Sequence, residues 1–187
     1  MNVIPTHGVR EYEVPLGQLN YKFVDFTAGP IEGVPNKWSH HLEAMHGLIF
    51  VVDLRWYDEY EESPHDDFSK TSLMQRSLDR YESIVKSPST GNRPIILVLT
   101  NKDGLRDKLP SRPLSSAWGS YFGGANPDAA ADFIMELFHS LSPERLLREP
   151  SGLYPFFWES KDANRIKNLF QTVQDVIIQK NLAPLLY

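Results

Sequence analysis

Two short apolar runs constrain the fold of this chain more than any other feature. Gly47–Leu54 (GLIFVVDL) and Pro94–Thr100 (PIILVLT) are almost continuously apolar and rich in β-branched side chains. Runs of this kind, bounded by polar or turn residues, are typical of strands in a parallel sheet that is covered on both faces. A third run, Tyr154–Ser160 (YPFFWES), has the same character through its aromatic residues. We therefore expect these runs to be buried strands.

Helical periodicity occupies the segments between and after these runs. Apolar residues recur there at spacings of three and four, which places them on one face of a helix. Asp162 stands where it can cap the last of these helices. The apolar positions are Met74, Leu78, Tyr81 and Val85; Ala131, Ile134, Met135 and Phe138; and Ile166, Leu169, Phe170, Val173, Val176 and Ile177. Strands that alternate with helices predict an α/β, doubly wound sheet, built as a single domain over residues 1–187.

Two further segments carry local signals. Arg10–Val14 and Leu19–Asp25 flank the short segment Pro15–Gln18, a pattern that predicts an antiparallel hairpin. The segment from Lys108 to Pro127 is long and rich in proline, serine and glycine, so we expect an irregular excursion at the surface.

Composition narrows the classes of function. The net charge of −5 argues against general nucleic-acid binding, which requires a clustered basic face. The absence of cysteine excludes disulfides and thiolate chemistry and suits the cytoplasm. No apolar run approaches the roughly 20 residues that a membrane-spanning helix needs, and Asn2 is not the glycine that myristoylation requires. We therefore expect contact with the inner face of the plasma membrane only through a partner.

Several segments resemble landmarks of the heterotrimeric G-protein alpha subunits, in the order in which that family carries them. Their specificity comes from this collinearity rather than from any single motif. Thr6-His7-Gly8-Val9 resembles the first switch, Phe23-Val24-Asp25 the strand entering the second switch, and Trp38–Tyr57 the switch helix with the next strand. Pro94–Asp103 resembles the guanine-reading loop with the strand before it, and the string GANPDAAADFI resembles the start of a following helix. Leu169–Leu182 resembles the last helix, and Ala183–Tyr187 resembles the receptor-facing tail.

The sequence also departs from this family at the positions that hold and cleave nucleotide. The phosphate-binding string GxxxxGK[ST] is not found in it, nor is the inserted helical domain. Val3 stands where the resemblance implies a catalytic arginine, and Asp25-Phe26-Thr27-Ala28-Gly29-Pro30 replaces Asp-x-Gly-Gly-Gln. The resemblance thus implies a GTPase-like fold without its first strand and phosphate loop. It gives no catalytic residue, so we expect no enzyme activity.

The resemblance implies vestigial nucleotide-binding candidates at two loops. Thr100, Asn101, Lys102 and Asp103 correspond to Asn-Lys-x-Asp, in which only the aspartate is kept in register. Asp103 presents two acceptors that suit the guanine ring nitrogens, although Asn-Lys-Asp-Gly is also a good polar turn. Ser160 and Lys161 fall at the last guanine-contacting loop. If any binding of GTP or GDP survives, Thr6 and Asp25 are the candidates for contact with Mg²⁺.

Two surfaces are candidates for partner binding by the same resemblance. The switch-helix segment Pro35–Met45, with Trp38 and His41, would face the beta-gamma dimer or effectors. The last helix and its tail would face a receptor, through Leu182, Leu185, Leu186 and Tyr187. The sequence therefore favours an alpha-like signalling protein of a receptor pathway that acts through partners, with nucleotide binding degraded or lost. The alternative is a genuine guanine-nucleotide-binding GTPase that obtains its phosphate contacts from another chain or from a missing amino-terminal segment.

Other polar clusters have simpler interpretations. His40, His41 and His46 lie close to Glu43, but on a helix they do not share a face, so we do not expect a zinc site. The acidic stretch Asp58–Asp67 is most simply a solvated loop.

The absent first strand raises a problem of sheet closure. In the family fold that strand lies between the hairpin strand and Gly47–Leu54, and its loss would leave backbone donors and acceptors unpaired. We expect Leu19–Asp25 to pair directly with Gly47–Leu54. The rival solution is a homodimer in which another copy of the chain supplies a strand.

Overall fold

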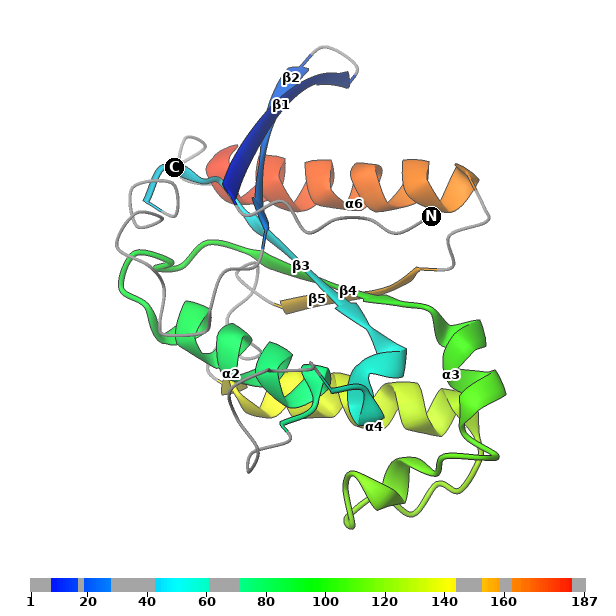
Figure 1. Cartoon of the computed structure of the whole chain (residues 1–187). Coiled ribbons are helices and arrows are strands. Elements are labelled where there is room, and N and C mark those ends of the chain that lie inside the picture. Colours follow the sequence, from blue (N-terminus) through cyan, green and yellow to red (C-terminus); the bar gives the residue numbers. More distant parts are fainter. Residues whose placement is uncertain are drawn as a thin grey trace.

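The computed structural model describes residues 8–16, 19–27, 43–60, 71–143, 153–158 and 163–182. The strands in this part of the chain are β1 (Gly8–Leu16), β2 (Leu19–Thr27), β3 (Leu48–Asp53), β4 (Ile95–Thr100) and β5 (Leu153–Trp158). The helices are α2 (Leu73–Lys86), α3 (Lys102–Lys108), α4 (Pro127–Ser140) and α6 (Ala163–Leu182), and two 3₁₀ turns are η1 (Leu54–Asp58) and η2 (Leu114–Ser116). Figure 1 shows their arrangement.

The strands form two separate sheets. Strands β3, β4 and β5 make a parallel sheet in that order, with Leu48 opposite Ile95 and Ile95 opposite Leu153. Strands β1 and β2 make an antiparallel hairpin whose ladder runs from Gly8–Thr27 to Leu16–Leu19. Parallel pairing brings the carboxyl ends of β3, β4 and β5 to one edge of the sheet, where loops can present polar side chains.

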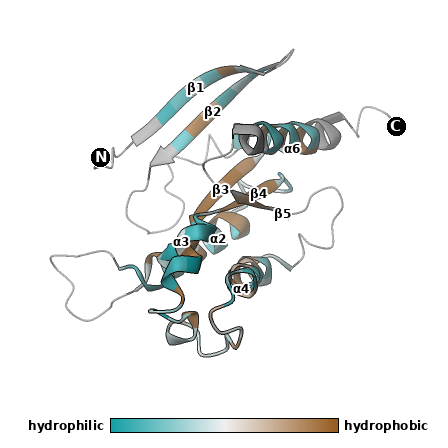
Figure 2. Cartoon of the chain, turned by 90° about the vertical axis from the view of Figure 1, so that its right-hand side faces the viewer, coloured by the Kyte–Doolittle hydropathy of each residue, from teal (hydrophilic) through white to brown (hydrophobic). Residues whose placement is uncertain are grey.

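Helices cover both faces of the parallel sheet (Figure 1). On one face α2 and α4 pack on the sheet through a ring cluster of Phe50, Tyr81 and Phe138, with ring centroids 5.3 to 6.0 Å apart. Burial of such large aromatic side chains supplies much of the stability of a core of this size. On the other face Val173 of α6 packs against Ile96 and Val98 of β4. Figure 2 shows the apolar strands between these helical layers.

Local signals explain where the helices begin. The Ser72 hydroxyl accepts a hydrogen bond from the Gln75 amide at the start of α2, at 3.1 Å. At the start of α4 the Asn126 side chain accepts from the amides of Asp128 and Ala129, and Pro127 occupies the first helical turn. None of the helices in the described ranges is both long and apolar enough to span a bilayer.

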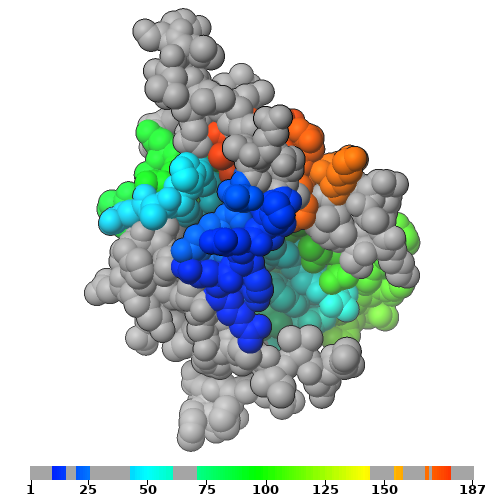
Figure 3. All heavy atoms as spheres, turned by 90° about the horizontal axis from the view of Figure 1, so that it is seen from above, coloured from blue at the N-terminus to red at the C-terminus, as the bar shows by residue number. Residues whose placement is uncertain are grey.

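The hairpin contacts α6 and does not add a strand to the parallel sheet. The rings of Phe23 on β2 and Phe170 on α6 meet edge to face at 5.7 Å, and Tyr21 stacks beside Phe23. Burial, with a smaller contribution from the nearby Asp175 carboxylate, raises the pKa of Tyr21. In the view of Figure 3 the hairpin forms part of the outer surface of the molecule.

The predicted strands and helices are confirmed with small shifts of their bounds. The hairpin strands are longer than expected, because Val9 and Phe26 extend the ladder at one end and Pro15 pairs with Asn20 at the other. The apolar stripe of α2 is buried as predicted at Met74, Leu78 and Tyr81. The described residues 153–158 contain β5, whereas Ser160 and the cap residue Asp162 lie outside the described part of the chain.

Two expectations need correction. The predicted direct pairing of Leu19–Asp25 with Gly47–Leu54 is wrong, because β2 pairs with β1 and β3 pairs with β4. The long excursion after Lys108 is irregular as expected, but it is not confined to the surface. Leu114 and Tyr121 are buried in the core, and the Tyr121 hydroxyl donates to the Asn126 carbonyl at 3.2 Å.

The contact between α6 and the sheet leads to a test of stability. Val173 is only 3% exposed, so Val173→Asp would place an unpaired carboxylate between α6 and β4. We expect a loss of about 4 kcal/mol or more in the free energy of unfolding, against totals of about 5–15 kcal/mol for typical domains. Urea denaturation followed by circular dichroism measures this loss. The control Asn168→Asp makes a similar change at an exposed position of α6 and should unfold like the parent. Equal midpoints for the two variants would show that α6 is not docked on the sheet.

Candidate functional site

The candidate site lies where β3 and β4 end. Asp53 is the last residue of β3 and Thr100 the last of β4, and the two are paired in the ladder. The Thr100 hydroxyl donates to the Val52 carbonyl at 3.1 Å, which ties the two strand ends together. In open α/β sheets this edge is where ligands usually bind. The predicted guanine-reading residues Thr100–Asp103 therefore stand at the edge that a ligand would use.

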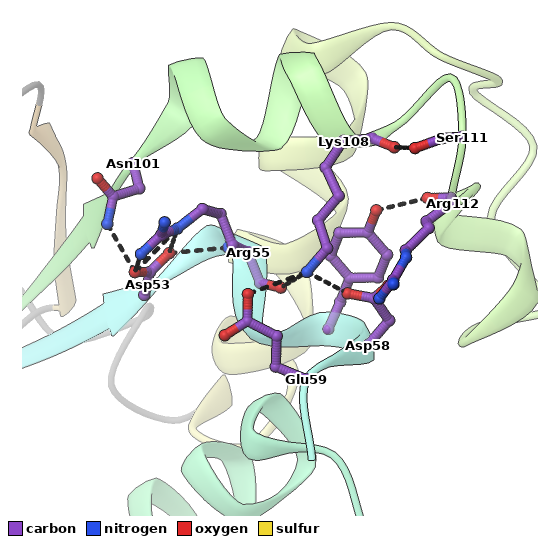
Figure 4. Close-up of polar contacts among 9 residues, drawn as sticks. Asp53, Arg55, Asp58, Glu59, Asn101, Lys108, Ser111 and Arg112 are labelled. Carbon is purple, nitrogen blue, oxygen red and sulfur yellow. Dashed lines mark hydrogen bonds and ion pairs between the residues drawn. The ribbon is translucent and has the colours of Figure 1, made fainter. Parts of the chain in front are cut away.

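A nearly buried carboxylate organises this edge (Figure 4). Asp53 is 8% exposed and accepts hydrogen bonds from the Arg55 guanidinium at 2.6 to 3.2 Å and from the Arg55 amide at 2.9 Å. It also accepts from the Asn101 side-chain amide at 2.6 Å. Burial alone would raise the pKa of Asp53, but the hydrogen bonds from Arg55 and Asn101 outweigh it and lower that pKa. Asp53 is therefore a charged structural anchor.

Asn101 adopts an unusual backbone conformation at this point. Its φ of 60° lies in the left-handed region, and it is the only non-glycine residue with a positive φ in the described ranges. Asparagine tolerates this region better than most residues because its short side chain can hydrogen-bond locally. The bond to Asp53 holds the side chain in place. The turn at Asn101 thus sets the direction in which α3 leaves β4.

The side chains of the next two residues, Lys102 and Asp103, differ in how far other residues bury and pair them. Lys102 is largely buried. Its ammonium pairs with Asp128 at 2.5 Å and lies 5.2 Å from the centre of the Phe157 ring. This ion pair lowers the pKa of Asp128. The Asp103 side chain is 59% exposed, and among the described residues it pairs with Arg106 alone, one helical turn away, at 2.5 Å. Exposed pairs of this kind are weak, so the Asp103 carboxylate remains accessible to a ligand.

A second polar cluster fixes α3 to η1 (Figure 4). The Lys108 ammonium pairs with Asp58 and with Glu59, and it donates to the Arg55 carbonyl at 2.8 Å. It also lies 5.2 Å from the centre of the Tyr57 ring. The Tyr57 hydroxyl donates to the Arg112 carbonyl at 2.5 Å, and burial, followed by the nearby Asp58 carboxylate, raises the pKa of Tyr57 to about 12. Tyr57 is therefore a neutral hydrogen-bond donor at physiological pH.

Five cations in the described part of this edge have acidic partners. Arg55 pairs with Asp53, Lys102 with Asp128, Arg106 with Asp103, and both Lys108 and Arg112 pair with Asp58. The accessible carboxylate of Asp103 can accept hydrogen bonds from a planar donor. The pairs of Arg106 and Arg112 leave more than half of each arginine side chain exposed and are weak, whereas Lys102 and Lys108 are largely buried. A phosphate group would have to displace an existing ion pair to reach either lysine.

The other candidate residues are not brought to this edge within the described part of the chain. Asp25 lies on β2 of the separate hairpin, where it is exposed and opposite Arg10. Leu182 is the last residue of α6. The remaining candidates lie outside the described residues: Thr6, Trp38, His41, Ser160, Lys161, Leu185, Leu186 and Tyr187.

The sequence does not predict that Asp53 and Asp128 contact the loop Thr100–Asp103. The apolar pattern places Asp53 only in a strand, although a carboxylate at the end of a buried parallel strand is itself a signal for this edge. Asp128 gave a weaker signal, because an acidic residue in the first turn of a helix is common for reasons of the helix dipole alone. Helix α3 was missed because Asn-Lys-Asp-Gly also fits a turn. These partners are separated by 26 to 48 positions in the chain, as Lys102–Asp128 and Asp53–Asn101 show.

The lowered pKa of Asp53 predicts a component of acid lability. A carboxyl whose folded pKa lies below its ordinary value of 3.8 stabilises the fold above that value and loses this contribution as the pH falls through the folded pKa. We expect Asp53→Asn to lower the free energy of unfolding at pH 7 by about 1–3 kcal/mol and to flatten its decline below pH about 4. Urea titrations between pH 7 and pH 3 measure this. Asp107→Asn, at an exposed position of α3, is the control and should leave the decline as steep as in the parent. An equally steep decline in Asp53→Asn would contradict the role of Asp53.

Comparison with known proteins agrees with the resemblance in the sequence. The family model of the G-protein alpha subunit matches residues 1–177. A guanine nucleotide-binding protein alpha-1 subunit of Mycosarcoma maydis is 32% identical over 181 residues, which is 96% of this chain and 48% of that protein. A guanine nucleotide-binding protein subunit alpha of Coprinellus congregatus and the G-protein complex alpha subunit gpaA of Aspergillus fumigatus are each 31% identical over 179 residues, with the same coverage. The chain spans about half the length of these curated relatives. It belongs to the G-protein alpha subunit family.

Proposed function

We propose that this chain is an alpha-subunit-like signalling protein of a G-protein-coupled receptor pathway that acts through protein partners, with guanine-nucleotide binding degraded. The observation that carries the proposal is the internal pairing of the charged groups around the guanine-reading loop. Lys102 is committed to Asp128 and Phe157, and Asn101 to Asp53. Of the predicted charged contacts in this loop, only Asp103 has an accessible side chain.

Electrostatics supports the loss of phosphate affinity. A triphosphate needs unpaired cations or a cradle of backbone amides, and in this fold the phosphate loop supplies both. Recruiting Lys102 instead would break its ion pair with Asp128 and leave an acidic group beside the incoming phosphates. The cost of that exchange opposes binding.

Family membership supports a role in signalling, and the partner surfaces follow from the resemblance. Trp38 and His41 belong to the segment that would meet a beta-gamma dimer or an effector. Leu182, Leu185, Leu186 and Tyr187 belong to the segment that would meet a receptor. Through these partners the chain would work in the cytoplasm, at the inner face of the plasma membrane.

The exposed carboxylate of Asp103 favours one alternative. At 59% exposure its side chain remains available to the edge of a guanine ring. A genuine GTPase that takes its phosphate contacts from another chain, with Mg²⁺, would use Asp103 in this way. The two functions make opposite predictions for nucleotide affinity.

Calorimetric titration with GDP and with a non-hydrolysable GTP analogue, each with Mg²⁺, tests this difference. We expect no binding tighter than about 100 μM, because Asp103 alone can orient a base but cannot hold charged phosphates. Asp103→Ala serves as the control for specificity and should give the same weak signal as the parent. A dissociation constant in the nanomolar range that depends on Mg²⁺ and is lost in Asp103→Ala would establish the alternative.

Binding to a purified beta-gamma dimer tests the positive half of the proposal. We expect the chain to bind immobilised beta-gamma, and Trp38→Ala to weaken that binding about tenfold or more, because buried tryptophans commonly dominate interface energies. The control is Phe122→Ala, which removes another large aromatic side chain, 90% exposed, at a position distant in sequence from both proposed surfaces. Equal losses in the two variants, or no binding by the parent, would refute the assignment of this surface.

A further inference from the structure

The turn between α2 and β4 presents an arginine to the end of the switch-helix segment Pro35–Met45. The structure describes the last three residues of that segment, and the first two of these are helical. The Arg93 side chain donates from Nε to the Met45 carbonyl at 2.6 Å and from Nη2 to the Glu43 carbonyl. Carbonyls at the end of a helix have no partner within the helix, and a cation stabilises them. Arg93 therefore caps the end of this segment from 48 to 50 positions away in the chain.

The same guanidinium is also held by its own turn. Its Nη1 donates to the carbonyls of Ser89 at 3.0 Å and Thr90 at 3.3 Å. Thr90 is fully buried, and its hydroxyl donates to the Ile84 carbonyl near the end of α2 at 2.7 Å. The Ser89 hydroxyl adds a contact to the Glu43 carboxylate at 3.3 Å. Because the planar guanidinium serves both groups of carbonyls at once, Arg93 links the switch-helix segment to the end of α2.

A second contact holds the chain three residues after Met45. The Leu48 amide donates to the carbonyl of Pro94, the residue between Arg93 and β4, at 2.9 Å. Between the two contacts the chain passes close to its neighbours, since a Cβ at Gly47 would lie 3.4 Å from side-chain carbons of both Pro94 and Ile177. The backbone is therefore fixed at two nearby points as it enters β3.

We propose that Arg93 is the positioning residue of the partner-binding segment. By holding the carbonyls of Glu43 and Met45, it fixes the direction in which Pro35–Met45 leaves the sheet and presents that segment to a protein partner. This inference rests on the proposed function of the segment. A segment that is ordered before binding loses less conformational freedom when a partner binds. Without Arg93 only a fraction of the molecules would present the segment correctly, and the affinity would fall by that fraction.

Amide hydrogen exchange followed by mass spectrometry tests the clamp in the absence of a partner. We expect Arg93→Ala to speed exchange about tenfold or more in the peptide that covers Glu43–Gly47, and to leave exchange in β4 unchanged, because a local opening exposes only the segment that it releases. The control is Lys86→Ala, which removes another cation at the end of α2. Lys86 is 68% exposed and pairs with Glu82 within the helix, so this variant should exchange like the parent. Unchanged protection of the peptide in Arg93→Ala, or equally faster exchange in β4, overturns the proposal.

Binding to an immobilised beta-gamma dimer tests the positioning role, at a temperature at which circular dichroism shows each variant to be folded. We expect Arg93→Ala to weaken binding about fivefold or more, and Lys86→Ala to bind like the parent. Arg93→Lys should lose less than Arg93→Ala, because an ammonium keeps the charge but cannot serve both groups of carbonyls in one geometry. Parent-like affinity in Arg93→Ala, or equal losses in Arg93→Ala and Lys86→Ala, overturns the proposal.

The two measurements separate this inference from the proposed function. If the parent binds the beta-gamma dimer and Arg93→Ala binds equally well, the proposed function stands and the positioning role of Arg93 is wrong. If the parent does not bind, the assignment of the partner surface fails and the presentation of Pro35–Met45 fails with it. Faster exchange confined to Glu43–Gly47, together with weaker binding by Arg93→Ala, supports both.

Discussion

The complete burial of β4 is the constraint on which the rest of the structure depends. None of the residues Ile95–Leu99 is more than 2% exposed, so every side chain on both faces of this strand must be covered. The helices α2 and α4 cover one face and α6 covers the other. Because β4 lies between β3 and β5, it also fixes where the polar residues that follow it emerge. The position of Thr100–Asp103 is thus a consequence of core packing.

At the polar edge, residues that the resemblance assigns to nucleotide binding make structural contacts with one another. Asp53 is buried, and a buried carboxylate is tolerated only when it is paired and hydrogen-bonded. Arg55 and Asn101 meet that need, which commits both of them. Lys102 is committed in the same way by Asp128. The described groups of this edge therefore hold one another in place, which supports the proposal that nucleotide binding is degraded.

The sequence was informative where packing is local and uninformative where partners are distant. The strand β4 and the helix α4 could be predicted because burial on both faces, or on one helical stripe, leaves a repeated apolar pattern. The pairing of Asp53 with Asn101 could not, because it joins residues 48 positions apart through a left-handed turn. The expected pairing of β2 with β3 was wrong for a related reason. It followed from the need to satisfy backbone groups, whereas the contact of Phe23 with Phe170, which holds the hairpin on α6, leaves no pattern in either segment alone.

The paired charges at the edge of the sheet and the exposed apolar side chains support the same proposal. Among the described residues, the charged side chains at the carboxyl edge of the sheet are paired with one another, whereas apolar side chains such as those of Val51 and Phe122 are exposed. Small charged ligands need free charges in a defined geometry, whereas protein partners can use strand edges and exposed aromatic groups. This arrangement supports the proposal that the chain acts through protein partners rather than through nucleotide.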